Sequence, residues 1–161
     1  MRTLQTLAAF AMALALAGCS ALSPYSTLTK LDLHLSGSDT LNPDLNGRPS
    51  PIVVRLFELK HPVAFLTADF FSLYQDPRAS LSPDLVSQEE LELRPGEQRE
   101  LKLSVEPGSR YVGVLAAYRD LPESNWRLVI PVQQKALNRT ALELDEKGIR
   151  DQATVSRKRE D

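Results

Sequence analysis

Few side chains in this 161-residue sequence have the types and spacing that catalysis requires. The two histidines, His34 and His61, do not stand in a metal-binding spacing such as H-E-x-x-H. No serine lies in a G-x-S-x-G context, and no glycine-rich loop suited to phosphate is present. Adjacent acids such as Glu89 and Glu90 would point to opposite sides of a strand. We therefore expect no catalytic residue, no metal site, no cofactor and no small-molecule substrate.

The side chain with the clearest chemistry is Cys19, the only cysteine of the chain. It follows a positively charged Arg2 and a short apolar stretch, the order of a secretory signal peptide that is too short to cross a bilayer as a helix. The sequence from Leu16 to Cys19 matches the lipobox of bacterial lipoproteins, in which the cysteine sulfur receives a diacylglycerol and the peptide is cut before it. We expect a signal peptide at 1–18 and a mature chain that begins at a lipidated Cys19; the alternative is an ordinary signal peptide with a coincidental cysteine.

Lipidation would anchor the protein to a membrane without threading it through. Each buried methylene contributes about 0.8 kcal/mol, so more than one acyl chain makes release slow. Ser20 follows the cysteine, whereas aspartate there is the usual signal for retention in the inner membrane. We therefore expect an outer-membrane lipoprotein whose folded domain faces the periplasm, with residues 19–27 as a short polar tether.

The mature length and charge favour one globular domain that does not bind nucleic acid. Removal of residues 1–18 leaves 143 of the 161 residues, enough for a hydrophobic core without disulfide bonds. Because Arg2 leaves with the signal peptide, 18 of the 19 basic side chains and all 21 acidic ones remain, a net charge of −3. No basic stripe interleaved with aromatic residues is present.

Strand patterns account for most of the mature sequence. Apolar and polar residues alternate from Thr29 to Leu35, and the apolar run Ile52 to Leu59 reads as a central strand that should pair with the first. Further strands are expected at 89–93, 101–105, 111–118, 126–132 and 138–145, with Pro131 marking an edge strand. Seven or eight short strands joined by short connections predict an all-β sandwich with antiparallel pairing. The domain would span 28–155, before a charged tail at 156–161.

A helical insertion at about 62–88 interrupts the strands. Apolar residues from Phe65 to Tyr74 recur every three to four positions, as on one face of a helix. Ser82-Pro83-Asp84 has the composition of a helix start and predicts a second helical turn there. The aromatic residues Phe65, Phe70, Phe71 and Tyr74 either pack the helix onto the sheet, which their spacing favours, or form a binding patch.

A long loop from Gly37 to Pro51 separates the first two predicted strands. Glycines, prolines and Asn or Asp residues surround Leu41 and Leu45, so no regular element can continue through it. A loop longer than about 12 residues in a compact domain is usually functional or disordered. Two leucines among turn-forming residues favour an ordered loop that displays apolar anchors, although both could instead fold back onto the domain.

Taken together, these segments resemble a known family. The lipobox, the first strand and the long loop are followed by P-x-V-V-R-L-F-E-L, by F-L-x-A-D-F-F-x-L-Y and by E-L-x-L-R-P-G-E. This order is similar to the TssJ lipoprotein family of the type VI secretion system, also called VasD or SciN. The resemblance is most specific over 51–74 and 90–97 and weakens after Trp126.

The resemblance implies a fold and a partner. The fold would be a transthyretin-like β-sandwich of two antiparallel sheets with a small helical insertion. The partner would be the C-terminal periplasmic domain of the inner-membrane protein TssM, with TssL joining the same complex indirectly. The family's contact element is the loop between the first two strands, which here corresponds to Leu41, Asn42, Pro43, Asp44, Leu45, Asn46, Gly47 and Arg48. Leu41 and Leu45 would then be exposed anchors, and Asp44 and Arg48 would orient the partner through polar contacts.

Two other functions fit the same pattern. One is a lipid-anchored assembly factor similar to a pilotin, serving a different envelope machine. The other is a periplasmic module that binds a glycan or small ligand through Trp126 and the loop from Tyr118 to Asn125. Loss of secretion in a Cys19→Ser variant would favour the type VI function over both.

Overall fold

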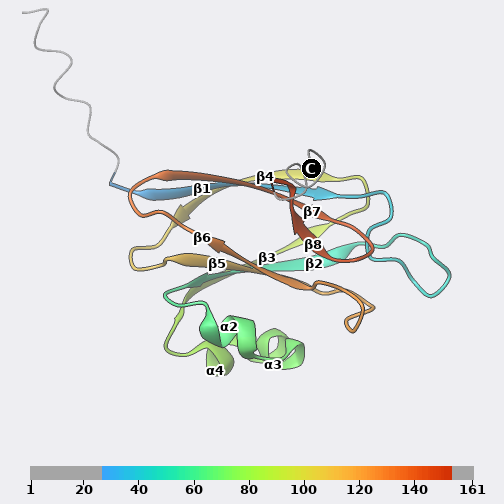
Figure 1. The fold of residues 1–161 in the computed structure, drawn as a ribbon, viewed down its shortest axis with the longest axis horizontal. Helices are drawn as coiled ribbons and strands as arrows, with labels where there is room; N and C mark the ends of the chain where they lie inside the picture. Colours follow the sequence, from blue (N-terminus) through green and yellow to red (C-terminus); the bar gives the residue numbers. More distant parts are fainter. Residues whose placement is uncertain (1–26, 154–161) are drawn as a thin grey trace, which may run out of the picture.

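The computed structural model describes residues 27–153, which form a β-sandwich with a helical insertion (Figure 1). The predicted signal peptide, Cys19 and the charged tail at 156–161 lie outside the described residues. The strands are β1 (Thr29–Gly37), β2 (Ile52–Leu59), β3 (Leu85–Leu93), β4 (Gln98–Val105), β5 (Tyr111–Ala116), β6 (Arg127–Pro131), β7 (Leu137–Leu144) and β8 (Ile149–Asp151). The helices are α2 (Val63–Thr67), α3 (Phe70–Gln75) and α4 (Pro77–Leu81).

The first sheet has the strand order β4-β1-β7-β8. Leu31, Leu33 and Leu35 of β1 are buried, and His34 between them is exposed, as the alternation predicts. The second sheet has the order β3-β2-β5-β6, with every pair antiparallel. β6, which ends at Pro131, lies at its edge, so the predicted edge strand is confirmed.

One prediction about strand pairing is wrong, and the predicted antiparallel pairing holds for every pair of strands except one. β1 does not pair with β2: its neighbours are β4, which is antiparallel, and β7, which is parallel. The segment 38–51 instead carries the chain from one sheet to the other. The parallel pair is possible because the whole second sheet lies between β1 and β7 in the sequence, a crossover long enough to return the chain in the same direction. Alternation shows which face of a strand is buried but does not identify the strand beside it.

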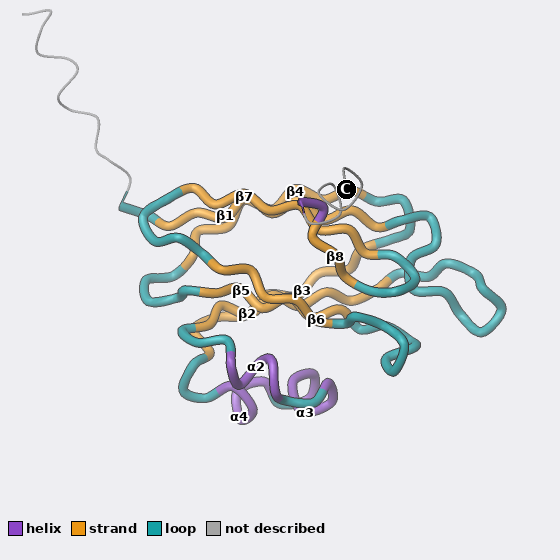
Figure 2. Tube along the Cα trace, viewed as in Figure 1, coloured by secondary structure: helices purple, strands orange, loops and turns teal. Residues whose placement is uncertain are grey.

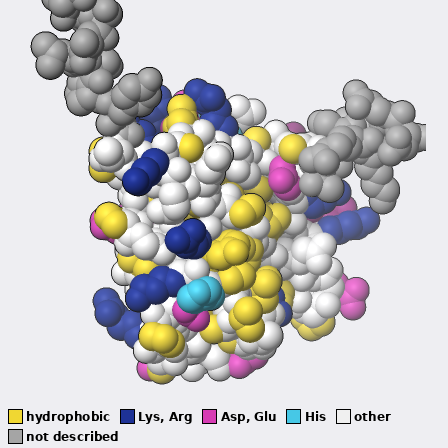
Figure 3. All heavy atoms as spheres, turned by 60° about the vertical axis from the view of Figure 1, so that its left-hand side comes forward, with side chains coloured by type: hydrophobic (Ala, Val, Ile, Leu, Met, Phe, Trp, Pro, Cys, Tyr) yellow, Lys and Arg dark blue, Asp and Glu magenta, His cyan; other side chains and the backbone are white. Residues whose placement is uncertain are grey.

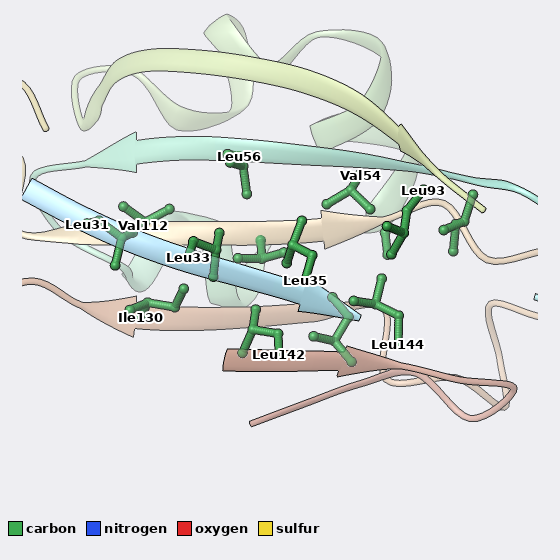
Figure 4. Close-up of a cluster of buried hydrophobic side chains, with 14 of the residues drawn as sticks. Leu31, Leu33, Leu35, Val54, Leu56, Leu93, Val112, Ile130, Leu142 and Leu144 are labelled. Carbon is green, nitrogen blue, oxygen red and sulfur yellow. The ribbon is translucent and has the colours of Figure 1, made fainter. Parts of the chain in front are cut away.

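The main core lies between the two sheets. Figure 4 shows leucine, valine and isoleucine side chains from both sheets meeting there, among them Leu31, Leu33, Leu35, Val54, Leu56, Leu93, Val112, Ile130, Leu142 and Leu144. All of them are buried. Truncating one such side chain to alanine costs about 2–5 kcal/mol, so this core holds the two sheets together.

The helical insertion covers the outer face of the second sheet (Figure 2). A second buried cluster joins Phe57, Leu59 and Leu115 of the strands to Phe65, Leu73 and Leu81 of the helices. Gly113 makes room for this packing, because an added Cβ would lie 3.0 Å from the Phe65 ring. Phe70 and Tyr74 pack against this cluster, so most aromatic residues of the insertion belong to the core, as their spacing favours. Phe71 is the exception and is 60% exposed.

The predicted helical turn at Ser82-Pro83-Asp84 is wrong. Ser82 is the C-cap residue that ends α4, and β3 begins at Leu85, so the helices of the insertion end earlier than position 88. α3 and α4 instead begin at two aspartates. The Asp69 side chain accepts a hydrogen bond from the Ser72 amide, and the Asp76 side chain accepts one from the Ala79 amide.

Two arginines from the second sheet fix the insertion in place. Arg127 Nη1 donates to the carbonyl oxygens of Phe65, at 3.0 Å, and Ala68, at 2.6 Å. Arg55 Nη1 donates to the Tyr74 carbonyl at 2.5 Å, and its guanidinium lies 3.9 Å from the centre of the Tyr74 ring. These charged donors satisfy carbonyl groups at the ends of short helices, so the insertion is a rigid part of the domain.

The two ends of the sandwich differ in what they carry. Residue 27 and the start of β1 lie at the left in Figure 1, and the loop from β1 to β2 projects from the right. β1 has nine residues and therefore separates the two ends by roughly 30 Å. We call these the N-terminal end and the loop end.

Candidate functional site

The candidate site is the loop at 38–51, which begins with a buried anchor. Leu41 is 0% exposed and belongs to the main core, so the prediction that it is an exposed anchor is wrong. Its amide donates to the Ser38 carbonyl at 3.2 Å, and its carbonyl accepts from the Ser50 amide at 3.0 Å. Gly37 leaves the space that Leu41 fills, because an added Cβ there would lie 3.1 Å from the Leu41 side chain. Leu41 thus supports the base of the loop.

Asn42 ties this base to the connection between β5 and β6. It is 3% exposed and has a positive φ of 45°, a backbone region that asparagine tolerates better than most residues. Its Oδ1 accepts from the Arg119 amide at 2.9 Å, and its Nδ2 donates to the Pro51 carbonyl at 3.0 Å. The polar composition of the loop gave no sign of this buried role, which depends on a residue 77 positions away.

Asp44 organises the tip of the loop. Its Oδ1 accepts from the amides of Asn46, at 2.8 Å, and Arg48, at 3.0 Å, and its Oδ2 lies 2.9 Å from Arg48 Nε. The Gly47 amide donates to the Asp44 carbonyl at 2.9 Å, which closes a turn, and Gly47 has a positive φ of 76°. These hydrogen bonds, above all the one from the Arg48 amide, hold the pKa of Asp44 below its usual value. Asp44 and Arg48 therefore bond to each other in this structure.

Leu45 stands at the apex of this closed tip, and its relative exposure is 107%. Single exposed leucines are common on protein surfaces. Here, however, the flanking residues hold the backbone through the Asp44 hydrogen bonds, while Asn42 and Leu41 hold the base. The loop presents one large apolar side chain on an ordered support, and such a side chain can be buried by a partner without first being ordered.

A cleft with a volume of about 580 Å³ lies beside the tip. It is formed by three segments of the loop end and lined by Asn42, Pro43, Asp44, Leu45, Tyr118, Arg119, Asp120 and Glu146. The carboxylates of Asp120 and Glu146 form no ion pair with another residue in 27–153. The Tyr118 hydroxyl is buried without a hydrogen-bond partner among these residues, and burial raises its pKa above the ordinary value. Asp44 is paired with Arg48, so the carboxylates of Asp120 and Glu146 face one lining cation, Arg119, and the cleft carries a small excess of negative charge.

The residues of the predicted alternative ligand site are not brought together. Tyr118 lines the cleft, but Trp126 packs against the insertion. Its ring meets Phe70 edge to face at 5.3 Å between centroids, and the Arg127 guanidinium lies 4.4 Å from its centre. Trp126 therefore serves the packing between sheet and helices and does not offer a free aromatic face beside the cleft.

Within residues 27–153, no group of three or more His, Cys, Asp or Glu side chains is arranged to hold a metal ion. The helices in this range are also all too short or too polar to cross a bilayer.

Comparisons with known proteins agree on one family. A sequence model described as "Type VI secretion lipoprotein, VasD, EvfM, TssJ" matches residues 29–147. The T6SS lipoprotein TssJ1 from Pseudomonas aeruginosa is 35% identical with a TM-score of 0.75, over 77% of this chain and 95% of that one. Lip from Serratia marcescens, a membrane-bound component of the type VI secretion system, is 24% identical with a TM-score of 0.72, over 76% and 96%.

A third solved chain is more distant in sequence. It comes from a structure described as the C-terminal domain of the T6SS protein TssM from EAEC. It is 21% identical with a TM-score of 0.65, over 76% of this chain and 97% of that one. Curated protein sequences gave no match.

Proposed function

This chain belongs to the type VI secretion lipoprotein family of VasD, EvfM and TssJ, and we propose that it anchors a type VI secretion membrane complex by binding the periplasmic domain of the inner-membrane protein TssM. The family is one of structural lipoproteins and not a known enzyme family. TssM is the partner that the sequence resemblance to this family implies.

The observation that carries the proposal is Leu45 at the tip of a supported loop. In an interface, a few large side chains buried near the centre contribute most of the binding free energy. Leu45 is fully exposed and its loop is ordered by Asp44, Asn42 and Leu41. It therefore has apolar area to bury and little conformational entropy to lose in its backbone. Of the residues predicted for partner contact, Pro43 to Arg48 are the ones exposed or half-buried at the tip.

The acidic cleft beside Leu45 defines the partner's chemistry further. Asp120 and Glu146 lack ion pairs among the described residues, so a lysine or arginine of the partner can enter without breaking one. Complementary charges of this kind mainly raise the rate of association and fix the orientation of the complex. The docking surface would then combine one apolar anchor with an acidic flank.

The lipid would attach to Cys19 and hold the domain, 28–155, on the periplasmic side of the outer membrane. Figure 1 supports separate sites for membrane attachment and partner binding, because residue 27 and the docking loop lie at opposite ends of the sandwich. The loop can therefore face away from the membrane, toward a partner that extends from the inner membrane, while TssL joins the complex only through TssM.

Calorimetric titration of the mature chain carrying Cys19→Ser with the periplasmic domain of TssM from the same bacterium tests this function. We expect binding, and we expect Leu45→Asp to weaken it about 30-fold or more, since a central anchor contributes at least about 2 kcal/mol. Phe71→Asp is the matched control, because Phe71 is also a large exposed apolar residue but lies on α3. Its binding should equal that of the unsubstituted chain.

Equal weakening by both substitutions would show that the loop is not the docking element. Loss of binding confined to Phe71→Asp would move the site to the insertion. Absence of binding by the unsubstituted chain, with circular dichroism showing it folded, would refute TssM as the partner.

A further inference from the structure

The N-terminal end of the sandwich is built from four segments that are hydrogen-bonded to one another. The Lys30 amide donates to the Ala136 carbonyl at 3.0 Å, and the Lys135 amide donates to Thr29 Oγ1 at 2.9 Å. The Arg110 amide donates to the Leu59 carbonyl at 2.8 Å. We call this end, formed by residues 28–30, 58–63, 106–110 and 132–137, the N-terminal rim.

The rim carries exposed cations that lack ion pairs. Lys30, Lys60, Arg110 and Lys135 are all exposed, and none of them forms a salt bridge with another residue in 27–153. Such a group of unpaired cations stands out on a chain whose net charge is −2. The loop end, in contrast, presents exposed groups of both signs, Arg119 and Lys147 beside Asp120 and Glu146.

Most carboxylates near the rim have other partners. Glu58 Oε2 accepts hydrogen bonds from the Glu106 amide and from Ser109 Oγ, both at 2.8 Å. Asp84 Oδ1 lies 2.8 Å from His61 Nδ1. Hydrogen bonds from neutral donors leave the charge of Glu58 in place, and Glu106 is an exposed carboxylate. The four cations still outnumber the carboxylates Glu58, Asp84 and Glu106, so the rim carries a small excess of positive charge.

Exposed apolar side chains accompany these cations. Leu28 is 56% exposed, Leu137 is 45% exposed, and Val63, the rim residue that starts α2, is 64% exposed. Figure 3 turns this end toward the viewer and shows hydrophobic and basic side chains exposed together on it. Cations mixed with exposed leucines are the composition of surfaces that lie on lipid headgroups.

The short segment before the rim limits how far this end of the domain can lie from the lipid. Eight residues, Ser20 to Thr27, separate Cys19 from the first strand segment, and fully extended they span at most about 28 Å. If Cys19 is lipidated, as the proposed function requires, the rim is the part of the domain held next to the bilayer.

We propose that the N-terminal rim docks on an anionic phospholipid surface, so that the domain stands on the membrane with its loop end pointing away. The acyl chains on Cys19 would supply the attachment itself, and a basic surface beside them would add an orienting contact with the headgroups. Because electrostatic attraction extends only about 8 Å at physiological salt, the rim must approach the headgroups closely for its charges to act. Docking would fix the orientation of the sandwich and hold the loop end roughly 30 Å from the rim, the length of β1.

Vesicle cosedimentation of the mature chain with Cys19→Ser tests this surface in the absence of the lipid. The vesicles contain either phosphatidylcholine alone or phosphatidylcholine mixed with phosphatidylglycerol. We expect binding to the mixed vesicles that is at least about tenfold tighter than to phosphatidylcholine and that weakens as salt is added. The triple variant Lys30→Glu, Lys60→Glu, Arg110→Glu should lose this preference.

The matched control reverses three cations at the loop end, Arg94→Glu, Arg99→Glu and Lys147→Glu, and so changes the net charge equally. We expect it to bind mixed vesicles as the unsubstituted chain does, and circular dichroism must show both variants folded. Equal losses in the two triple variants would show that net charge alone acts, and equal binding to both kinds of vesicle would show that no anionic lipid is recognised. Either result, or no binding to either vesicle, would overturn the proposal without bearing on TssM binding.

Discussion

Leu41 and Leu45 occupy the same loop, four positions apart, and have opposite environments. Leu41 is 0% exposed in the core and Leu45 is 107% exposed at the tip. The sequence alone left open whether either leucine folds back, because both stand among the same turn-forming residues. Their difference depends on the space beside Gly37 and on the hydrogen bond from the Arg119 amide to Asn42, and the second contact joins residues 77 positions apart.

Asp44 makes the loop tip sensitive to acid. Its folded pKa lies below the value of about 3.9 expected in an unfolded chain, chiefly because the Arg48 amide donates to it. The carboxylate therefore stabilises the tip above that pH, and the contribution is lost as pH falls through the folded pKa. In an NMR titration we expect the amide signals of Asn46 and Arg48 to move together only below about pH 4.

The Asp44→Asn variant serves as the control for this titration, since its side chain does not ionise. Its two amide signals should show no shared movement in the same pH range. A transition of these signals above the unfolded value in the unsubstituted chain would mean that the carboxylate destabilises the tip, contrary to the hydrogen bonds described.

At the scale of elements, sequence patterns predict which face of a strand is buried and where helices interrupt the strands. They predict less well which strands pair with each other. The alternation of Leu31, Leu33 and Leu35 predicts the buried face of β1, and Pro131 predicts an edge strand; both are confirmed. The sequence did not predict the parallel pairing of β1 with β7. These strands are more than 100 residues apart, so no turn sequence between them marks the pairing. The sequence predicts a helix start at Ser82-Pro83, whereas α4 begins after Asp76 and ends at Ser82.

The insertion should depend on Arg127 for stability. Arg127→Ala removes the donor to two carbonyl oxygens and the cation beside the Trp126 ring, so we expect the free energy of unfolding to fall by about 2–3 kcal/mol. Urea unfolding followed by Trp126 fluorescence measures it. Arg78→Ala, on the exposed surface of α4, should change it by less than about 0.5 kcal/mol. Similar small losses in both variants would show that the arginine does not fix the helices.

At the scale of the whole molecule, the proposed function places the lipid and the loop at opposite ends of the sandwich. Cys19→Ser should leave the domain folded and its affinity for TssM in solution unchanged, because the substitution lies outside the β-sandwich. In the bacterium, however, the protein should no longer fractionate with the outer membrane, and type VI effector secretion should be lost. Normal secretion by a demonstrably mislocalised variant would contradict the anchoring role.

The central claim is that Leu45 contacts TssM in the assembled machine, and site-specific photocrosslinking in the secreting bacterium tests it most directly. A photoreactive amino acid replaces Leu45 in one strain and Phe71 in another, two exposed positions on different parts of the domain. We predict an adduct with TssM from position 45 and none from position 71. An adduct from position 71 without one from position 45 would place the partner on the helical insertion and contradict the account.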